Sequence, residues 1–365
     1  MLRVLALVPY PLDRAPSQRF RIEQWAPFLR ASGVEVTFQP LQDQALFDHL
    51  AAPGHPVGKA LGVGWAALRR LGVFGRLDRC DVVFLHREAL SFGPALLEPL
   101  LARRRPLVFD FDDSIWLPNE NPGNPLAPML KFPGKTAQIC SAAALVVTGN
   151  DYLADWARRH ARWVEALPTT IATEGDYARC KVHRETPSPV VGWSGTRTTE
   201  RYLHTLSGAL GALSRARSVR LRAISNGVPT VPGLDLEAVP WRAAQEVDDL
   251  LSFDVGLMPQ PDEEWAKGKC GLKALQYMAL GIPPVVSPTG ALPSIVEHGV
   301  SGFLASDEAS WIAALDRLCA DAALRTRVGA QARAVVHQRF GARTQAIRLA
   351  RLLEEVASGA DRSPT

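Results

Sequence analysis

The chain has 365 residues, of which 47% are hydrophobic and 21% charged, and its formal net charge is +4. This length exceeds what one hydrophobic core usually serves, so we expect two domains. So small a charge, without basic runs interleaved with aromatic residues, argues against nucleic acid as a partner. Five scattered cysteines without a CxxC pair predict reduced thiols, a cytoplasmic location and no zinc site. No apolar run reaches the roughly 20 residues that a membrane-spanning helix needs.

Short apolar runs, typical of buried parallel strands, recur along the first half with helical stretches between them. We expect these strands at 2–8, 34–38, 81–85, 106–109 and 143–148. A polar loop follows the first strand, and a helix is expected over 20–31, ending at Ser32 and Gly33. This β-loop-α-β opening and the repeated βα units predict a parallel sheet.

The segment 168–189, rich in Thr, Glu and Pro, interrupts this rhythm and reads as a connector. Strands are then expected at 190–193, 219–225, 255–258 and 284–287. Helices are expected between them, at 199–213, 243–251 and 272–280. The prediction is an α/β protein of two Rossmann-like, doubly wound parallel-sheet domains that face a central cleft, where a ligand should lie at the carboxyl ends of the strands.

The expected boundaries follow from these elements. An N-terminal domain covers 1–168, a linker 169–189 and a C-terminal domain 190–340. A last helix at 341–357 comes after the second domain is complete, so it is expected to pack back on the first domain. The tail 358–365 is expected to be disordered.

The stretch DEEWAKGKCGLKALQYMALGIPPVVSPTG carries the strongest sign of a ligand site. Lys269, Lys273 and Gln276 fall at i, i+4 and i+7, which places them on one helical face. Gly268 and Gly271 lie at the start of that helix, where backbone N–H groups and lysines can hold an anion. The alternative is a solvated amphipathic helix, but glycines at the start of the helix favour a site.

The sequence GWSGT lies between a predicted strand and a helix, and two glycines and two hydroxyls suit a turn that approaches phosphate. Its candidate residues are Gly192, Ser194, Gly195 and Thr196. Arg197 follows directly and could reach a pyrophosphate. A plain βα turn followed by a surface arginine is the alternative.

In the first half, PLDRAPSQRFR follows the first strand, and its Arg19 is a candidate for bidentate contact with phosphate. Arg21 is expected to cap or to form a salt bridge on the helix. Asp110 and Asp112 follow a strand in VFDFDDSIW, and His86 ends another in VVFLH. Carboxylates this close raise one another's pKa or need cationic partners. The two aspartates could bind a divalent metal as a DxD motif, or they could contact the substrate directly.

The stretch 59–79 contains five basic residues, a single acidic residue and apolar residues between them. Such a stretch can lie on an anionic membrane surface. The alternative is an ordinary amphipathic surface helix.

From Trp265 to Ala305, a helix, MALGIPPVV, a loop of small residues and IVEHGVSGFLA follow one another. This order resembles the donor-binding region of GT-B glycosyltransferases of the large retaining family four, and VVGWSGTRTTERYL resembles the opening of their C-terminal domain. The resemblance covers nearly the whole chain. The family's two glutamates, with seven residues between them, are replaced here by Gly268 and Gln276, and a subgroup with KCGLKxLQYMA in their place looks similar to this chain.

The resemblance implies transfer of a sugar from a UDP-, GDP- or TDP-sugar to a hydroxyl of a glycan or a lipid-linked glycan, as in polysaccharide biosynthesis. It implies retention at the anomeric carbon, no metal or other cofactor, an acceptor-side N-terminal domain and a donor-binding C-terminal domain. We expect a cytoplasmic enzyme, with peripheral contact at the inner face of the membrane through 59–79. The alternatives are a sugar-nucleotide epimerase of GT-B fold and a degenerate protein that only binds a nucleotide sugar.

The resemblance also gives the candidate residues their roles. The catalytic candidates are Asp112, Asp110 and His86, with Asp112 near the position that relatives often fill with histidine. The donor and phosphate candidates are Arg19, Gly192, Ser194, Gly195, Thr196, Arg197, Lys269, Gly271, Lys273 and Gln276, the last at the ribose.

Overall fold

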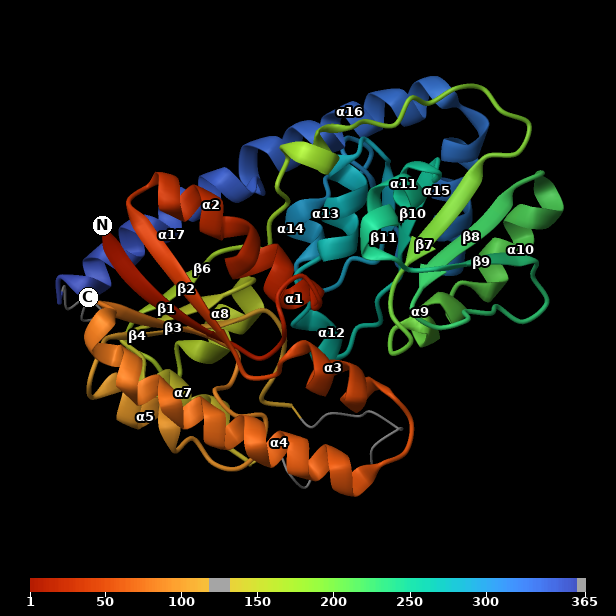
Figure 1. Ribbon diagram of the computed structural model, residues 1–365. Helices are drawn as coiled ribbons and strands as arrows, with labels where there is room; N and C mark the ends of the chain where they lie inside the picture. Colours follow the sequence, from red (N-terminus) through yellow and green to blue (C-terminus); the bar gives the residue numbers. More distant parts are fainter. Residues whose placement is uncertain (118–131, 360–365) are drawn as a thin grey trace. The chain divides into compact units, whose positions relative to one another are not determined.

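The computed structural model describes residues 1–117 and 132–359, so residues 360–365 of the expected tail lie outside the described part (Figure 1). The chain divides into two compact units. Unit 1 comprises Met1–Thr169 together with Ala342–Thr365, and unit 2 comprises Thr170–Gly341. Each unit contains one parallel six-stranded sheet, so the predicted fold class of two parallel-sheet α/β domains is confirmed.

The sheet of unit 1 has the order β2-β1-β3-β4-β5-β6 and is parallel throughout. Its strands are β1 Leu2–Val8, β2 Val34–Pro40, β3 Val82–His86, β4 Leu107–Phe111, β5 Leu145–Thr148 and β6 Val164–Ala166. The central strands β3, β4 and β5 are buried along their whole length, which explains their continuous apolar sequences. Asp110 lies inside β4, whereas the apolar run alone predicts a strand that ends at residue 109.

Helices cover both faces of this sheet. They are α1 Pro16–Gln18, α2 Gln24–Ala31, α3 Gln44–Ala51, α4 Pro56–Arg70, α5 Leu97–Ala102, α7 Lys135–Ala142, α8 Asp151–Ala157 and α17 Ala342–Ala357. Helix α17 packs against α2, and Figure 1 shows this pair on one side of the sheet and α4, α5 and α7 on the other. A 3₁₀ segment, Leu71–Arg79, continues α4 toward β3.

The helix expected over 20–31 is broken. A π-helical turn, Arg19–Glu23, joins α1 to α2, and Arg21 within it has non-helical angles of φ −124° and ψ −111°. Such irregular turns often mark functional sites. Here the turn directs the Arg21 side chain into the interior of unit 1, where it is fully buried.

The sheet of unit 2 has the order β12-β11-β10-β7-β8-β9 and is also parallel throughout. Its strands are β7 Val190–Ser194, β8 Arg220–Ser225, β9 Leu236–Pro240, β10 Val255–Met258, β11 Pro284–Val286 and β12 Phe303–Leu304. Read from β9, this is the order of a dinucleotide-binding doubly wound sheet.

The helices of unit 2 are α9 Glu200–His204, α10 Ser207–Ala216, α11 Glu246–Leu251, α12 Glu264–Lys267, α13 Leu272–Ala279, α14 Leu292–Ile295, α15 Glu308–Ala320 and α16 Ala322–Arg339, with 3₁₀ turns at Gly175–Ala178 and Ala243–Gln245. A core of residues from α9, α10 and α15 packs on one face of the sheet. The segment after Thr170 is held along α16 by arginines: Arg333 donates to the carbonyl of Arg179 at 2.7 Å, and Arg325 donates to that of Arg184 at 2.8 Å.

Candidate functional site

Both groups of candidate residues lie where the strand order of a sheet reverses, between β1 and β3 in unit 1 and between β7 and β10 in unit 2. At such a point the loops after the two strands diverge and leave room for a ligand at the carboxyl ends of the strands. In unit 1, His86 ends β3 and Asp110 lies near the end of the adjacent β4. In unit 2, the 192–197 loop continues β7, and the 269–276 segment follows β10.

The centre of the unit 1 group is a buried ion pair between Arg21 and Asp110, both fully buried. The Nε atom of Arg21 donates to both carboxylate oxygens of Asp110 at 3.0 Å, and another guanidinium nitrogen donates to the Leu167 carbonyl at 2.9 Å. On the other side, His86 Nδ1 lies 2.6 Å from Asp110 Oδ2. Arg21 therefore forms the salt bridge that the sequence suggested, but with a residue 89 positions away.

The Asp110 carboxyl is kept ionised by these partners. Burial acts to raise its pKa, but the charge of Arg21 and the hydrogen bond to His86 outweigh burial and hold the pKa below its usual range. A buried carboxylate with all its partners in place is a weak base. Its role in this arrangement is to fix the orientation of His86.

Ser17 extends the group toward solvent. Its Oγ donates to Asp112 Oδ1 at 2.6 Å and lies 3.0 Å from His86 Nε2. A hydroxyl has one hydrogen to donate, so if it goes to Asp112, His86 Nε2 must donate to Ser17. Since Asp110 is ionised and accepts from Nδ1, all three contacts are satisfied together when His86 carries hydrogen on both ring nitrogens.

Asp112 is a second permanently ionised carboxylate. Arg87 donates to its Oδ1 at 3.1 Å and lies 3.7 Å from Asp113 Oδ2. Burial acts to raise the pKa of Asp112, but the charges of Arg87, His86 and Arg21 outweigh it and lower that pKa strongly. Arg87 itself has a left-handed backbone, with φ 60°, in the turn directly after β3.

These pairings concern the two roles considered for Asp110 and Asp112, which are metal binding as a DxD motif and direct contact with the substrate. Within residues 1–117 and 132–359, no group of three or more His, Cys, Asp or Glu side chains is arranged to hold a metal ion. Asp110 is bound to Arg21 and His86, and Asp112 to Ser17 and Arg87. These contacts cover both oxygens of Asp110 and Oδ1 of Asp112, and the metal-binding role of the two aspartates stays a hypothesis.

Arg19 lies in the π-helical turn with its guanidinium 5.1 Å from the centre of the Phe20 ring. The ion pair with Asp110 is made by Arg21 and not by Arg19. Arg19 therefore stays a predicted phosphate contact.

In unit 2, the GWSGT turn depends on two glycines for close packing. A Cβ on Gly192 would come within 2.1 Å of the Phe253 ring, and one on Gly195 within 2.1 Å of the Trp193 ring. The backbone N–H of Arg197 donates to Asn226 Oδ1 at 2.9 Å, which ties this turn to the loop after β8. The two loops thus form one rigid edge beside the end of β7.

The start of α13 carries the residues predicted to bind an anion. Gly271 caps it in the left-handed region, with φ 73°, a conformation that favours glycine. Lys269 Nζ lies 5.5 Å from the centre of the Trp265 ring, and Lys273 Nζ donates to Gln276 Oε1 at 3.1 Å. The two lysines and the glycine cap therefore lie together within one turn of the chain.

Gln276 is fully buried and donates through Nε2 to the Tyr177 hydroxyl. Tyr177 in turn lies 3.5 Å from Glu246 Oε2, and Trp241 donates to the other oxygen of Glu246 at 3.0 Å. The ribose contact of Gln276 stays a prediction, and a ribose that reached it would meet this polar chain. Its members come from separate segments, and no local sequence pattern identifies Tyr177 or Glu246.

One hydrogen bond joins the two parts of the unit 2 group. The Tyr277 hydroxyl accepts from the backbone N–H of Ser194 at 2.8 Å, so α13 is fastened to the end of β7. The Gly192–Arg197 loop and the start of α13 are in this way brought to the same edge of the sheet. Their role as a phosphate site stays a prediction.

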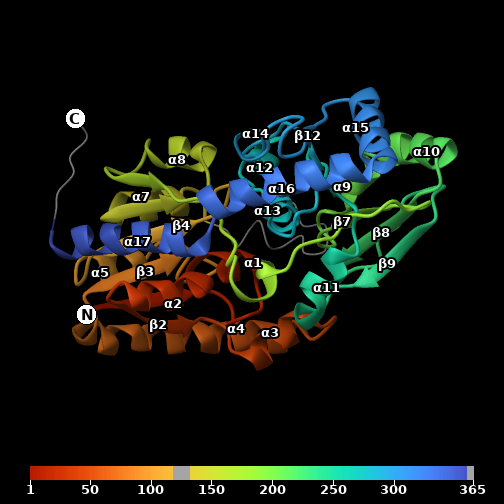
Figure 2. The ribbon, with the colours of Figure 1, turned by 90° about the horizontal axis from the view of Figure 1, so that it is seen from above.

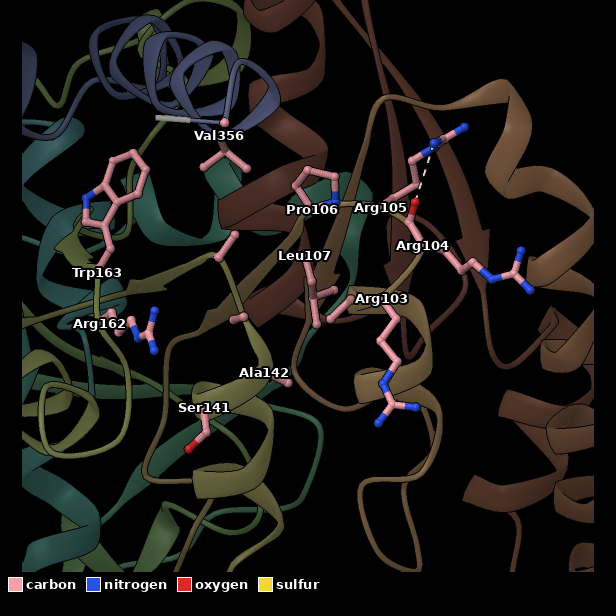
Figure 3. A pocket seen from close by; sticks show the side chains of 14 residues that line it. Arg103, Arg104, Arg105, Pro106, Leu107, Ser141, Ala142, Arg162, Trp163 and Val356 are labelled. Atoms are coloured by element: carbon pink, nitrogen blue, oxygen red, sulfur yellow. Dashed lines mark hydrogen bonds between the residues drawn. The ribbon is translucent and has the colours of Figure 1, made fainter. Parts of the chain in front are cut away.

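A cavity of about 530 Å³ lies at the opposite edge of the unit 1 sheet, where β4 and β5 begin (Figure 3). Several arginines line it, but in Figure 3 the side chains of Arg103 and Arg104 point away from each other, and Arg105 turns back to the Arg104 carbonyl at 3.4 Å. Helices α5 and α7 end at this edge, and the carbonyl ends of helices disfavour anions. We assign no ligand to this cavity.

Comparison with known proteins agrees with this geometry. Residues 189–321 match the family described as glycosyl transferases group 1. A D-inositol 3-phosphate glycosyltransferase from Stackebrandtia nassauensis is 33% identical over 143 residues, which make up 34% of this chain and 31% of that protein. The match thus spans less than a third of the length of that relative.

The whole chain is similar in structure to solved proteins of low sequence identity. Sucrose-phosphate synthase from Thermosynechococcus elongatus has a TM-score of 0.69 at 14% identity, with 99% of this chain and 100% of that chain covered. A glycosyltransferase from Rickettsia africae ESF-5 has a TM-score of 0.70 at 10% identity, covering 98% and 99%. HepE from Anabaena, in complex with UDP and glucose, has a TM-score of 0.68 at 15% identity, covering 97% and 100%.

The fold is therefore that of the GT-B glycosyltransferases, with two parallel-sheet α/β domains of six strands each. The residues that match the glycosyl transferases group 1 family, 189–321, make up the larger part of unit 2. Together, the domain match and the relative support a glycosyltransferase.

Proposed function

We propose that this protein transfers a sugar from a nucleoside diphosphate sugar to a hydroxyl group of a glycan or lipid-linked glycan. The observation that carries the proposal is the start of α13, where Lys269, Lys273 and the Gly271 cap lie together inside the glycosyltransferase group 1 domain. The neighbouring structure of HepE holds UDP and glucose, which supports a UDP-sugar as the first donor to test.

Unit 2 binds the donor in this proposal. The lysines neutralise the charge of the departing diphosphate, and the backbone N–H groups of the Gly192–Arg197 loop hold its oxygens. This stabilisation grows as the bond to the sugar breaks, because negative charge then accumulates on the diphosphate. Arg19 of unit 1 is proposed as a further phosphate contact.

Unit 1 binds the sugar or acceptor hydroxyls through Asp112. A carboxylate with a strongly lowered pKa accepts hydrogen bonds well but takes up a proton poorly, so Asp112 orients a hydroxyl and does not deprotonate it. Its negative charge also stabilises the oxocarbenium-like centre that develops on the sugar. Asp110 and His86 are positioning residues, since they act through Ser17 and Asp112.

The resemblance to the retaining family supports retention at the anomeric carbon and a reaction that needs no metal. It also supports a role in polysaccharide biosynthesis in the cytoplasm, with peripheral contact at the inner face of the membrane through residues 59–79.

The reaction is tested by incubating the purified chain with UDP-, GDP- and TDP-sugars, with and without acceptor extracts. Release of nucleoside diphosphate that depends on acceptor is the expected result. Isomerised donor without transfer would identify an epimerase instead, and binding without turnover would identify a protein that only binds nucleotide sugars.

The donor site is tested by Lys273→Ala, which should abolish turnover and leave the fold intact. Lys267→Ala is the matched control, because Lys267 is a neighbouring lysine that pairs with Asp262 at the surface. Equal activity of both variants would remove Lys273 from the site.

A further inference from the structure

Helix α4 presents an apolar stripe to solvent. Its Val57, Leu61, Trp65 and Leu68 side chains are 71%, 71%, 68% and 61% exposed, and Leu71, which follows the helix, is 47% exposed. The spacing i, i+4, i+8 and i+11 places the four helical residues on one face. A surface helix ordinarily turns its polar face outward, so this arrangement is inverted.

The basic residues of the same helix point the other way. Lys59 donates to the carbonyls of Leu50 and Ala52, and Arg69 to Asp43 and the Leu41 carbonyl. The Arg70 side chain is buried and donates to the carbonyls of Gln39 and Val8. Three of the five basic residues counted in 59–79 thus bind acceptors of unit 1 itself, two of them partly or fully buried and Arg69 at the surface.

The end of the stripe lies next to a basic cavity. A cavity of about 520 Å³ is lined by Phe38, Gln39, Pro40, Arg69, Arg70, Gly72 and Arg76. In the described part of the chain, two buried polar atoms of its lining, Gln39 Oε1 and Arg70 Nε, lack a hydrogen-bond partner. Arg76 and Arg79 are exposed and form no ion pair with any described residue.

We propose that the α4 stripe and this cavity form a docking site for an anionic phospholipid surface. The apolar stripe enters the boundary between headgroups and acyl chains, and Arg76, with the cavity, takes a headgroup phosphate. Figures 1 and 2 both show α4 along the outer edge of unit 1. None of the described helices is long and apolar enough to cross a membrane.

This inference rests on the proposed membrane contact and not on the proposed reaction, because vesicle binding needs neither donor nor acceptor. The test is flotation of the full chain with vesicles of phosphatidylcholine alone and of phosphatidylcholine with phosphatidylglycerol. We expect binding to the second kind, weakened by salt because exposed charges are screened.

The double variant Leu61→Ser with Trp65→Ser should lower vesicle binding by at least about tenfold, since both apolar contacts are lost. Arg76→Gln should lower it by about fivefold on the anionic vesicles only. Val228→Ser is the matched control, since Val228 is 80% exposed but lies in unit 2, outside the stripe. It should bind as the unaltered chain does.

Three outcomes would overturn the proposal. They are failure of the unaltered chain to bind anionic vesicles, equal binding by the double variant, and a dimer in sedimentation velocity that the double variant dissociates. The last outcome would assign the stripe to a second copy of the chain. Because the altered side chains are exposed, circular dichroism should show an unchanged fold. Acceptor-dependent release of nucleoside diphosphate, measured without vesicles, reports separately on the reaction.

Discussion

Replacing Arg21 with methionine should destabilise unit 1 far more than the loss of a surface ion pair would. Arg21 and Asp110 are both fully buried, and the arginine also satisfies the Leu167 carbonyl. Without it, a buried carboxylate keeps only His86 as a partner, and a buried carbonyl loses its donor. Removing one partner of a buried pair costs about 3–5 kcal/mol, so we expect the free energy of opening of unit 1 to fall by that amount.

The measurement is hydrogen exchange at equilibrium, read by mass spectrometry on peptides from β1, β3 and β4. Peptides from unit 2 are the internal reference, because the two units need not unfold together. Arg3→Met is the matched control, since Arg3 pairs with Asp81 at 2.8 Å on the surface. It should leave exchange nearly unchanged, because exposed ion pairs contribute little.

The pH dependence gives the same prediction a second readout. The folded-state pKa of Asp110 is lowered, so the stability it contributes is present above its unfolded pKa of about 3.9 and is lost as pH falls through the folded value. In Arg21→Met the isolated carboxyl is expected to take up a proton more easily. The gap between the two proteins should therefore narrow as the pH falls through the folded-state pKa of this carboxyl in the variant. A gap that is constant with pH, or no larger than that of Arg3→Met, would refute the reasoning.

The remaining predictions concern Asp112 and two glycines. Asp112→Asn should lower kcat about tenfold or more and change the KM for donor little. The pH profile of kcat should not shift between about pH 5 and 8, because the pKa of Asp112 lies far below that range. A shift of the acidic side of the profile would show that Asp112 titrates during the reaction. Gly192→Ala should lower the thermal stability of unit 2 by about 1–3 kcal/mol, since its Cβ would meet the Phe253 ring at 2.1 Å. An added Cβ on Gly64, inside α4, would have no atom within 4 Å, so Gly64→Ala should leave stability unchanged or raise it by up to about 1 kcal/mol. A similar loss of stability in both glycine variants would contradict the packing argument.

Most of the strands that the sequence predicted are largely buried, and the edge strand β2 is the exception. The predicted ranges agree with β1, β2, β3, β4, β5, β7, β8, β10 and β11 to within two residues at each end. The strands it missed, β6, β9 and β12, lie at sheet edges. β6 and β12 have only three and two residues, and no residue of β9 is fully buried. A strand without a buried face has no distinctive periodicity to read.

The sequence predicts where individual residues of the candidate site lie, but not which residues contact one another. The strand-end positions of His86 and Asp110 follow from the local sequence, because each ends an apolar run. The partners do not, since Ser17 and Arg21 lie 69 and 89 residues away from them. The break at Arg21 also had no local signal: residues 20–31 have a helical pattern, and the π-helical turn forms where the side chain meets Asp110.

For the same reason, the charge counted from the sequence of residues 59–79 is larger than the charge that this stretch presents to solvent. Sequence alone cannot tell an arginine that faces solvent from one that donates to buried carbonyls, as Arg70 does. Burial lowers the pKa of Arg70 to about 10, which still leaves it charged at neutral pH. Its charge therefore stabilises the ends of β1 and β2, and it is not available on the helix surface.

Opposite charges face one another in the unit 1 group, and this determines how its variants must be interpreted. Arg21 pairs with Asp110, and Arg87 with Asp112 and Asp113, so neutralising Asp112 leaves Arg87 with fewer partners in a largely buried place. A loss of turnover in Asp112→Asn is consequently evidence for catalysis only if hydrogen exchange in β1, β3 and β4 is unchanged. If hydrogen exchange also rises, the effect on stability and the effect on turnover are separated by a second substitution that removes the cation paired with Asp112. If Arg87→Met restores protection to Asp112→Asn without restoring turnover, the carboxylate acts on the substrate and not only on the fold.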